Sequence, residues 1–159
     1  WKSRLSNVIT IWNNNSNYRV AAKELNTASA NIRLESPSSW DDIKWGANTI
    51  AFADGRDANL FWWITSTPSS FQVSMSDITE FALIRFNKKF NSSFTNSEKD
   101  SVITHELGHV MGLGHPIKFN SSTKKFENDL SVSSIMKAVQ PLPSAPTLHD
   151  RNDLYNFYK

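Results

Sequence analysis

The stretch that decides the fold spans residues 95–115 and reads TNSEKDSVITHELGHVMGLGH. Thr95 with Glu98 three residues later fits a capping box, the hydrogen-bonded pair that starts many helices. Ser97 with Asp100 offers a second register for the same start. Apolar residues then recur every three or four positions, which is the spacing of one helix face. The stretch therefore predicts a helix that begins within its first few residues.

Three histidines follow inside this stretch. His105 and His109 are four residues apart, so on a helix they lie one turn apart on the same face and can reach one ion. Gly112 falls where the apolar period ends, and glycine tolerates the left-handed conformation that ends a helix and reverses the chain. Such a turn can bring His115 back as a third nitrogen ligand. The spacing therefore predicts a metal site at the end of the helix.

The residue types of this cluster favour zinc in a catalytic setting. The chain has no cysteine, so an ion must be held by His, Asp or Glu. Three imidazoles leave the fourth zinc position open for water, which is the catalytic pattern, whereas structural zinc has four protein ligands. Glu106, next to the first ligand, is placed near that water as the general base. A bare H-E-x-x-H can also be a solvated helix face, but Gly112 and His115 at fixed offsets favour the metal site.

Length and charge restrict the other classes of protein. The 159 residues, 39% of them hydrophobic, are enough for one domain with a core. The net charge of +2 comes from scattered Lys and Arg with no basic block, which argues against a nucleic-acid partner. No apolar run approaches the roughly 18 residues that span a bilayer. We expect a single monomeric domain over residues 1–159 without a membrane span.

Short runs of alternating or β-branched residues predict a sheet around the central helix. We expect strands at residues 8–12, 31–36, 49–54, 60–65 and 80–90, the last of which also fits a helix. Helices are predicted at residues 16–30 and 149–159, the second with Leu154, Phe157 and Tyr158 facing inward. This order of elements predicts an α+β fold with a mixed sheet flanked by helices.

The sequence HELGHVMGLGH matches the signature H-E-x-x-H-x-x-G-x-x-H, and the chain resembles the metzincin zinc endopeptidases. Within this clan, the ending Gly-Leu-x-His is similar to that of the matrixins. The resemblance implies a twisted five-stranded mixed sheet, two long helices over an active-site cleft, and a small C-terminal subdomain with a terminal helix. It divides the chain into an upper part of about residues 1–114 and a lower part of about residues 115–159.

The resemblance also implies roles for single residues. An enzyme of this kind hydrolyses peptide bonds with water activated by one zinc ion, and Glu106 would act as base and then as acid. Met136, in the run SSIM, is similar to the methionine of the Met-turn beneath the metal. An aspartate at the place of Asp150 belongs to structural contacts in the family. The candidate substrate-binding residues are Trp62, Trp63 and Ile64 on an edge strand, with Lys137, Ala138 and Val139 on the opposite wall.

The chain departs from the family in several places. Lys137 and Ala138 stand where matrixins usually have Tyr-Pro. No tyrosine lies two residues after Met136, so the extra zinc-side tyrosine of astacins and serralysins is missing. Residues 117–133 form an unusually long connection, which we interpret as an insertion. No cysteine-switch peptide is present, so latency would depend on a missing pro-segment or on a proteinaceous inhibitor. His149 lies outside the motif and is predicted to be a surface or capping residue.

Two further interpretations of the metal cluster stay open: a zinc-binding recognition or adhesion domain without turnover, and a zinc hydrolase of non-peptide amides or esters. Residues 54–59, DGRDAN, carry oxygen ligands that could bind calcium, but they lack the distal glutamate of a full calcium loop and fit a plain turn better. A compact, mildly basic domain of this clan suggests a secreted or cell-surface protein that acts on proteins or peptides.

Overall fold

The helices and the main sheet share one core cluster of buried apolar side chains. The computed structural model describes residues 1–16, 32–37, 39–40, 48–56, 62–63 and 81–158. Its helices are α1 (Leu5–Asn15), α3 (Asn96–Val110) and α4 (Leu148–Tyr158), with short 3-10 helices η1 (Lys2–Arg4) and η2 (Lys88–Phe90). Its strands are β1 (Ile32–Glu35), β2 (Ala51–Arg56), β3 (Trp62–Trp63), β4 (Phe81–Phe86), β5 (Ile117–Asn120) and β6 (Lys125–Asn128). No helix among these residues combines the length and apolar character needed to cross a bilayer.

Four strands form the main sheet, in the order β1-β4-β2-β3. β1 runs parallel to β4, whereas β2 is antiparallel to both β4 and β3. The sheet is therefore mixed, as predicted, but the described residues contain four of the five strands expected. The strands predicted at 31–36 and 49–54 are confirmed. Of the run 60–65 only residues 62–63 are described, and the run 80–90 forms β4 followed by η2.

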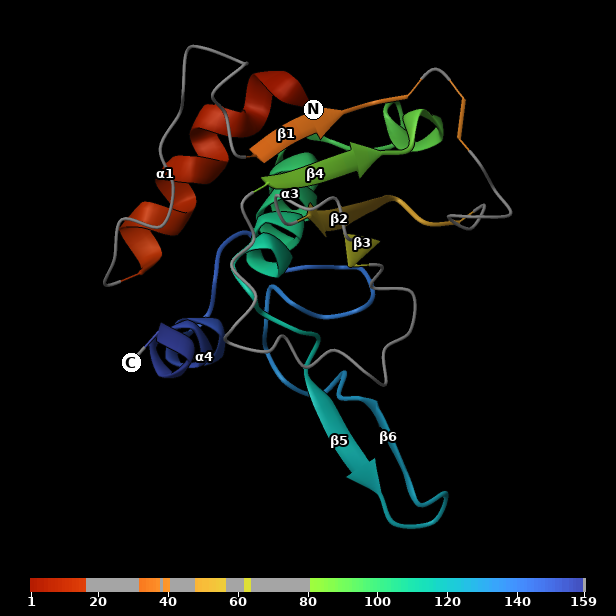
Figure 1. The fold of residues 1–159 in the computed structure, drawn as a ribbon, viewed down its shortest axis with the longest axis vertical. Coiled ribbons are helices and arrows are strands. Elements are labelled where there is room, and N and C mark those ends of the chain that lie inside the picture. The colour runs from red at the N-terminus through yellow and green to blue at the C-terminus, as the bar shows by residue number, and fades with distance from the viewer. Residues whose placement is uncertain (17–31, 38, 41–47, 57–61, 64–80, 159) are drawn as a thin grey trace.

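One face of the sheet packs against the helices, and Figure 1 shows α3 lying behind β4 and β2. Leu34, Ile84 and Ala53 lie in register on three neighbouring strands, and all three are buried. Ile103 and Leu107 of α3 belong to the same core cluster. Burial of a large aliphatic side chain stabilises the fold by roughly 1.5–3 kcal/mol. The helix that carries the histidines is thus held against a rigid layer.

The prediction of a strand at residues 8–12 is wrong, because this run belongs to helix α1. Val8 and Trp12 are four residues apart, and both are fully buried on one helical face. The indole Nε1 of Trp12 donates to the carbonyl oxygen of Thr104 in α3 at 3.0 Å. Packing of this face against α3 outweighs the strand preference of the β-branched residues, which is a weak local bias.

Some predictions fall where the structure gives no description. The helix expected at 16–30 lies outside the described residues except for its first position. Residues 57–59 of the run considered for calcium lie outside them as well. The division of one domain into an upper and a lower part stays a prediction.

The capping box at the start of α3 is confirmed in its first register. The backbone N–H of Glu98 donates to Oγ1 of Thr95 at 3.3 Å, and the backbone N–H of Thr95 donates to Oε2 of Glu98 at 2.7 Å. The second register is not used, because Asp100 is buried and accepts hydrogen bonds from Arg4 and Asn7. This carboxylate therefore joins the start of α1 to α3 instead of capping a helix.

The other end of α3 turns at Gly112, which has φ of 92°. The N–H of Leu113 donates to the carbonyl of Gly108, and the N–H of Gly112 donates to the carbonyl of His109, both at 3.0 Å. These two bonds form a Schellman motif, which satisfies the free carbonyls of a helix end. The chain therefore leaves the helix in a fixed direction, two residues before His115.

Replacing Gly112 with alanine is expected to destabilise the fold by about 2 kcal/mol. Alanine at this position would have to adopt the left-handed backbone conformation. Its Cβ would also lie 2.8 Å from the Phe157 ring. Gly114→Ala is the matched control, because nothing lies within 4 Å of its added Cβ. Urea unfolding of both variants in the metal-free protein measures the difference. Equal stabilities would show that the turn tolerates a side chain.

Residues 117–133, predicted as an insertion, contain a β-hairpin made of β5 and β6. The two strands pair antiparallel, with Phe119 opposite Phe126, and Figure 1 shows them projecting from the rest of the molecule. The alternation of Ile117, Lys118 and Phe119 is a strand signal that the interpretation as a plain insertion did not use.

Helix α4 confirms the terminal helix and corrects one of its inward residues. Leu154 is buried and Phe157 packs against the turn at Gly112. Tyr158, predicted to face inward, is instead 59% exposed, and its hydroxyl donates to the carbonyl oxygen of Met111 at 3.1 Å. His149 lies at the surface as predicted and pairs with Asp153 at 3.0 Å.

Candidate metal centre

The three histidines of the motif meet at the end of α3. The Nε2 atoms of His105 and His109 are 3.0 Å apart, those of His109 and His115 are 3.1 Å apart, and those of His115 and His105 are 3.4 Å apart. Tetrahedral zinc with Zn–N distances of 2.0–2.1 Å requires ligand nitrogens about 3.3 Å from one another. The spacing of the three nitrogens therefore matches the face of one zinc tetrahedron.

Hydrogen bonds on the opposite ring nitrogens orient two of these side chains. Nδ1 of His105 donates to the carbonyl oxygen of Ile135, and Nδ1 of His109 donates to that of Leu113, each at 2.8 Å. A neutral imidazole that donates through Nδ1 carries a lone pair on Nε2. These lone pairs point at one another, which is unfavourable unless a cation lies between them. The donor set thus fits a metal ion.

Burial keeps the histidines in the form that binds metal. It lowers the pKa of all three side chains, that of His105 to about 4 and that of His109 well below its ordinary value. Neutral imidazole is the ligand form, so the site needs no deprotonation at pH 7.

The turn after α3 positions two ligands at once. Leu113 donates its N–H to Gly108 and accepts the Nδ1 hydrogen of His109 at its carbonyl. His115 follows two residues later. The residues that end the helix therefore also orient one ligand and return the chain toward the ion for another.

Met136, the candidate Met-turn residue, packs against Gly108 of α3. Its side chain is 2% exposed, and a Cβ added to Gly108 would clash with its sulfur. The Met136 side chain thus fills the space that a side chain at position 108 would need. Ile135, the preceding residue, supplies the carbonyl that orients His105.

One buried carboxylate holds this turn. Asp150, at the start of α4, accepts a short hydrogen bond from Ser134 and one from the backbone N–H of Ile135 at 2.9 Å. It also accepts from the N–H and the hydroxyl of Thr147, at 2.7 and 2.8 Å. Asp150 therefore acts as a structural link, as the resemblance implies, and Ser134 is a member of the link that the sequence interpretation did not single out.

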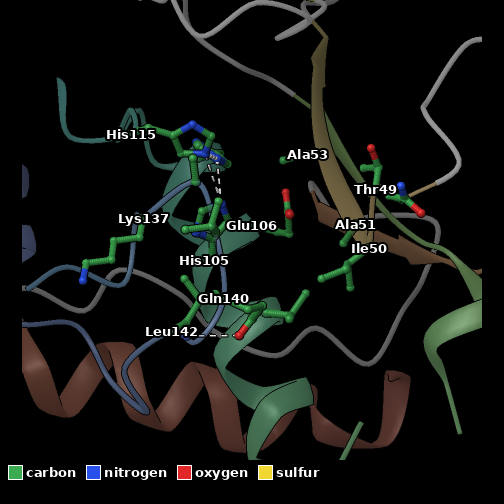
Figure 2. Close-up of a pocket in the computed structure, with 15 residues that line it drawn as sticks. Thr49, Ile50, Ala51, Ala53, His105, Glu106, His115, Lys137, Gln140 and Leu142 are labelled. Carbon is green, nitrogen blue, oxygen red and sulfur yellow. Dashed lines mark hydrogen bonds between the residues drawn. The ribbon is translucent and has the colours of Figure 1, made fainter. Parts of the chain in front are cut away.

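Glu106 lies on the sheet side of α3, close to Ala53 of β2 (Figure 2). Burial raises the pKa of its carboxyl group to about 8, and a hydrogen bond from the backbone of Ala53 opposes this shift. A carboxyl group with pKa near neutrality can both accept and return a proton at pH 7. The arrangement places an acid–base group on the same helix as the ligands, one residue after the first.

In the metal-free protein, we expect Glu106→Gln to be more stable than the wild type at pH 7 by roughly 3 kcal/mol. The folded-state pKa of about 8 lies above the ordinary 4.5, so stability present below pH 4.5 is lost as the pH rises toward 8. Glutamine cannot titrate. The histidines contribute equally to the pH dependence of stability in both proteins, so they cancel in the difference. Urea unfolding between pH 4.5 and 8 measures the difference. A constant difference across this range would show that Glu106 titrates normally.

A cavity of about 490 Å³ opens beside the histidines and Glu106. In Figure 2, the residues that line the cavity lie on either side of α3. One wall is the segment that leads into β2, and the other is the segment after the Met-turn. Apolar side chains line much of it: Ile50, Ala51, Val102, Ala138, Val139 and Leu142. The polar groups of the site therefore converge at one end of a largely apolar pocket, which is typical of ligand sites.

The candidate substrate-binding residues are placed differently on the two walls. Lys137, Ala138 and Val139 all line the cavity. Trp62 and Trp63 pair through their backbones with Arg56 and Gly55 of β2, and their role at the cavity stays a prediction. Ile64 lies outside the described residues.

Comparisons with known proteins point to one group. The chain is 29% identical over 119 residues to a serralysin of Photorhabdus laumondii subsp. laumondii, and 28% identical over 117 residues to a serralysin of Photorhabdus luminescens. These matches cover 65% and 64% of this chain but only 23% and 22% of the relatives, so the chain spans less than a quarter of their length. No family model matches the chain, and no solved structure matches it significantly.

The two relatives support a metzincin at the level of the clan. Both are named serralysin, so they give no support to the finer placing among the matrixins. The extra tyrosine associated with serralysins would stand at position 138, which is Ala138 in this chain. The similarity therefore supports the clan and no finer group within it.

Proposed function

We propose that this protein is a zinc-dependent endopeptidase of the metzincin clan. The observation that carries the proposal is the convergence of three histidine Nε2 atoms, 3.0–3.4 Å apart, with the buried carboxyl group of Glu106 in one cavity. The distant similarity to two serralysins supports the same class of activity. A binding domain alone does not need Glu106 beside the ligands.

The roles of the residues follow from their positions. His105, His109 and His115 would hold one zinc ion, which lowers the pKa of a bound water and polarises a peptide carbonyl. Glu106 accepts a proton from the attacking water and delivers it to the leaving amine. Its carboxyl group lies between α3 and β2 and lines the same cavity as the three histidines, which supports both steps.

The finer placing is also a proposal. Coordination by three histidines without a tyrosine, together with the ending Gly112-Leu113-Gly114-His115, is similar to the matrixins. The apolar lining around Val102, Val139 and Leu142 supports a peptide substrate with an apolar side chain near the cleaved bond. We further propose a secreted or cell-surface monomer acting on proteins or peptides, whose activity a pro-segment or a protein inhibitor controls.

Metal analysis combined with mapping of cut sites tests this function. We expect the purified protein to contain about one zinc per chain and to cleave a complex peptide mixture. A chelator should abolish cleavage, and added zinc should restore it. Zinc without cleavage would favour a recognition or adhesion domain, and cleavage of small amides or esters but of no peptide would favour a non-peptide hydrolase. Absence of zinc would contradict the whole proposal.

A further inference from the structure

The hairpin formed by β5 and β6 has one apolar face that nothing in the described structure covers. Phe119 and Phe126 stand opposite each other, their rings 5.4 Å apart, and Ile117 lies on the same face two residues before Phe119. These three side chains are 51–61% exposed, and Leu130 at the base of the hairpin is 50% exposed. Large apolar side chains gathered on a projecting hairpin indicate an interaction surface.

The opposite face fixes the shape of the hairpin. Asn120 and Thr123 both donate to Oε1 of Glu127, at 2.9 and 3.0 Å, and the Asn120 side chain also accepts from the N–H groups of Ser122 and Thr123. An isolated two-stranded hairpin is only marginally stable. This network holds the turn, so the apolar face is presented as a preformed surface.

The charges at the tip favour an anionic partner. Lys118 lies 3.6 Å from Asp129, and the carboxylate of Glu127 is held by neutral donors. Lys124 and Lys125 at the turn have no carboxylate partner among the described residues. The turn of the hairpin therefore carries two lysines, of which Lys125 lies opposite Asn120 on the polar face.

The size of the face distinguishes between partners. Together, the four half-exposed side chains offer on the order of 400 Å² of apolar accessible surface. A stable protein interface buries about 800 Å² on each partner, so the face is too small for a lasting dimer or complex. A lipid surface sets no such minimum, because each apolar side chain partitions into it separately while lysines remain at the headgroups.

We propose that the hairpin formed by β5 and β6 binds anionic lipid surfaces, with Ile117, Phe119 and Phe126 entering the interface and Lys124 and Lys125 contacting the headgroups. This inference does not depend on the proposed peptidase activity. Since β5 begins two residues after His115, a bound surface would lie close to the metal centre along the chain.

Sedimentation with lipid vesicles tests the proposal on the whole chain. We expect binding to phosphatidylcholine vesicles that contain about 30% phosphatidylserine, and weaker binding to phosphatidylcholine alone. The variant Lys124→Glu/Lys125→Glu should bind the anionic vesicles about tenfold less, with no change of packing. Phe119→Ser/Phe126→Ser should lose at least about tenfold on both kinds of vesicle.

The control for the aromatic variant is Phe119→Leu/Phe126→Leu, which keeps an apolar face and should retain most of the binding. Circular dichroism tests whether each variant is folded. If the serine variant does not fold, the test of lipid binding rests on the glutamate variant. Absence of binding to anionic vesicles, or binding that neither the serine nor the glutamate variant reduces, would overturn the proposal and leave the face to a transient protein partner.

Discussion

Glu106→Gln is expected to lower peptide cleavage by about 10²–10⁴-fold while the protein keeps its zinc. Glutamine has nearly the same shape but cannot accept the proton of the attacking water. The three ligand nitrogens and their hydrogen bonds to Ile135 and Leu113 do not involve this side chain, so the metal should remain bound. Initial rates on a mapped peptide, measured together with zinc content, report both effects.

The control is Glu98→Gln, the same chemical change two turns earlier on the same helix. Glu98 is exposed and belongs to the capping box, which glutamine can also complete, so this change should leave the stability within about 0.5 kcal/mol and the rate within about twofold. If Glu106→Gln retained wild-type cleavage, the proposed acid–base role would be wrong. If it lost its zinc, Glu106 would instead have a role in building the site.

Asp150→Ala is expected to destabilise the protein by about 4–5 kcal/mol. The carboxylate is 1% exposed and accepts from Ser134, Ile135 and Thr147, whose buried donors would lose their partner. Because Ile135 also orients His105, zinc affinity should fall about 10–100-fold. Urea unfolding of the metal-free protein and competition with a zinc chelator measure the two effects separately.

Asp153→Ala, on the same helix, provides the comparison. Its side chain is more than half exposed and pairs with His149 at the surface, so the change should cost less than about 0.5 kcal/mol and leave zinc affinity unaltered. Equal losses for the two variants would show that the Met-turn does not depend on Asp150.

The metal centre could be predicted from the sequence because most of its geometry is local. His105, His109 and Gly112 are related by helix spacing and by one left-handed turn, and both depend on the residues themselves. The capping box at Thr95 was predictable for the same reason. Met136 and Asp150 are more distant in the chain, and only the resemblance to a family connected them to the site.

Elements whose conformation depends on distant packing were harder to predict. The run 8–12 has β-branched residues, yet Trp12 reaches Thr104, which is 92 residues away. Tyr158 has an inward position on a helical wheel, but its hydroxyl bonds to Met111 at the surface. Residues 48–51 and 53 line the cavity beside the sheet, and their position next to α3 depends on the pairing of β2 with β4.

The turn at Gly112 links the lifetime of the bound ion to the fraying of a helix. Opening the last turn of α3 breaks the bonds from Leu113 to Gly108 and from Gly112 to His109, and it removes the acceptor that orients the His109 ring. An ion held by the three histidines resists this opening, and conversely leaves most readily when the turn opens. We therefore expect dissociation of a bound metal to be coupled to local unfolding of this helical turn.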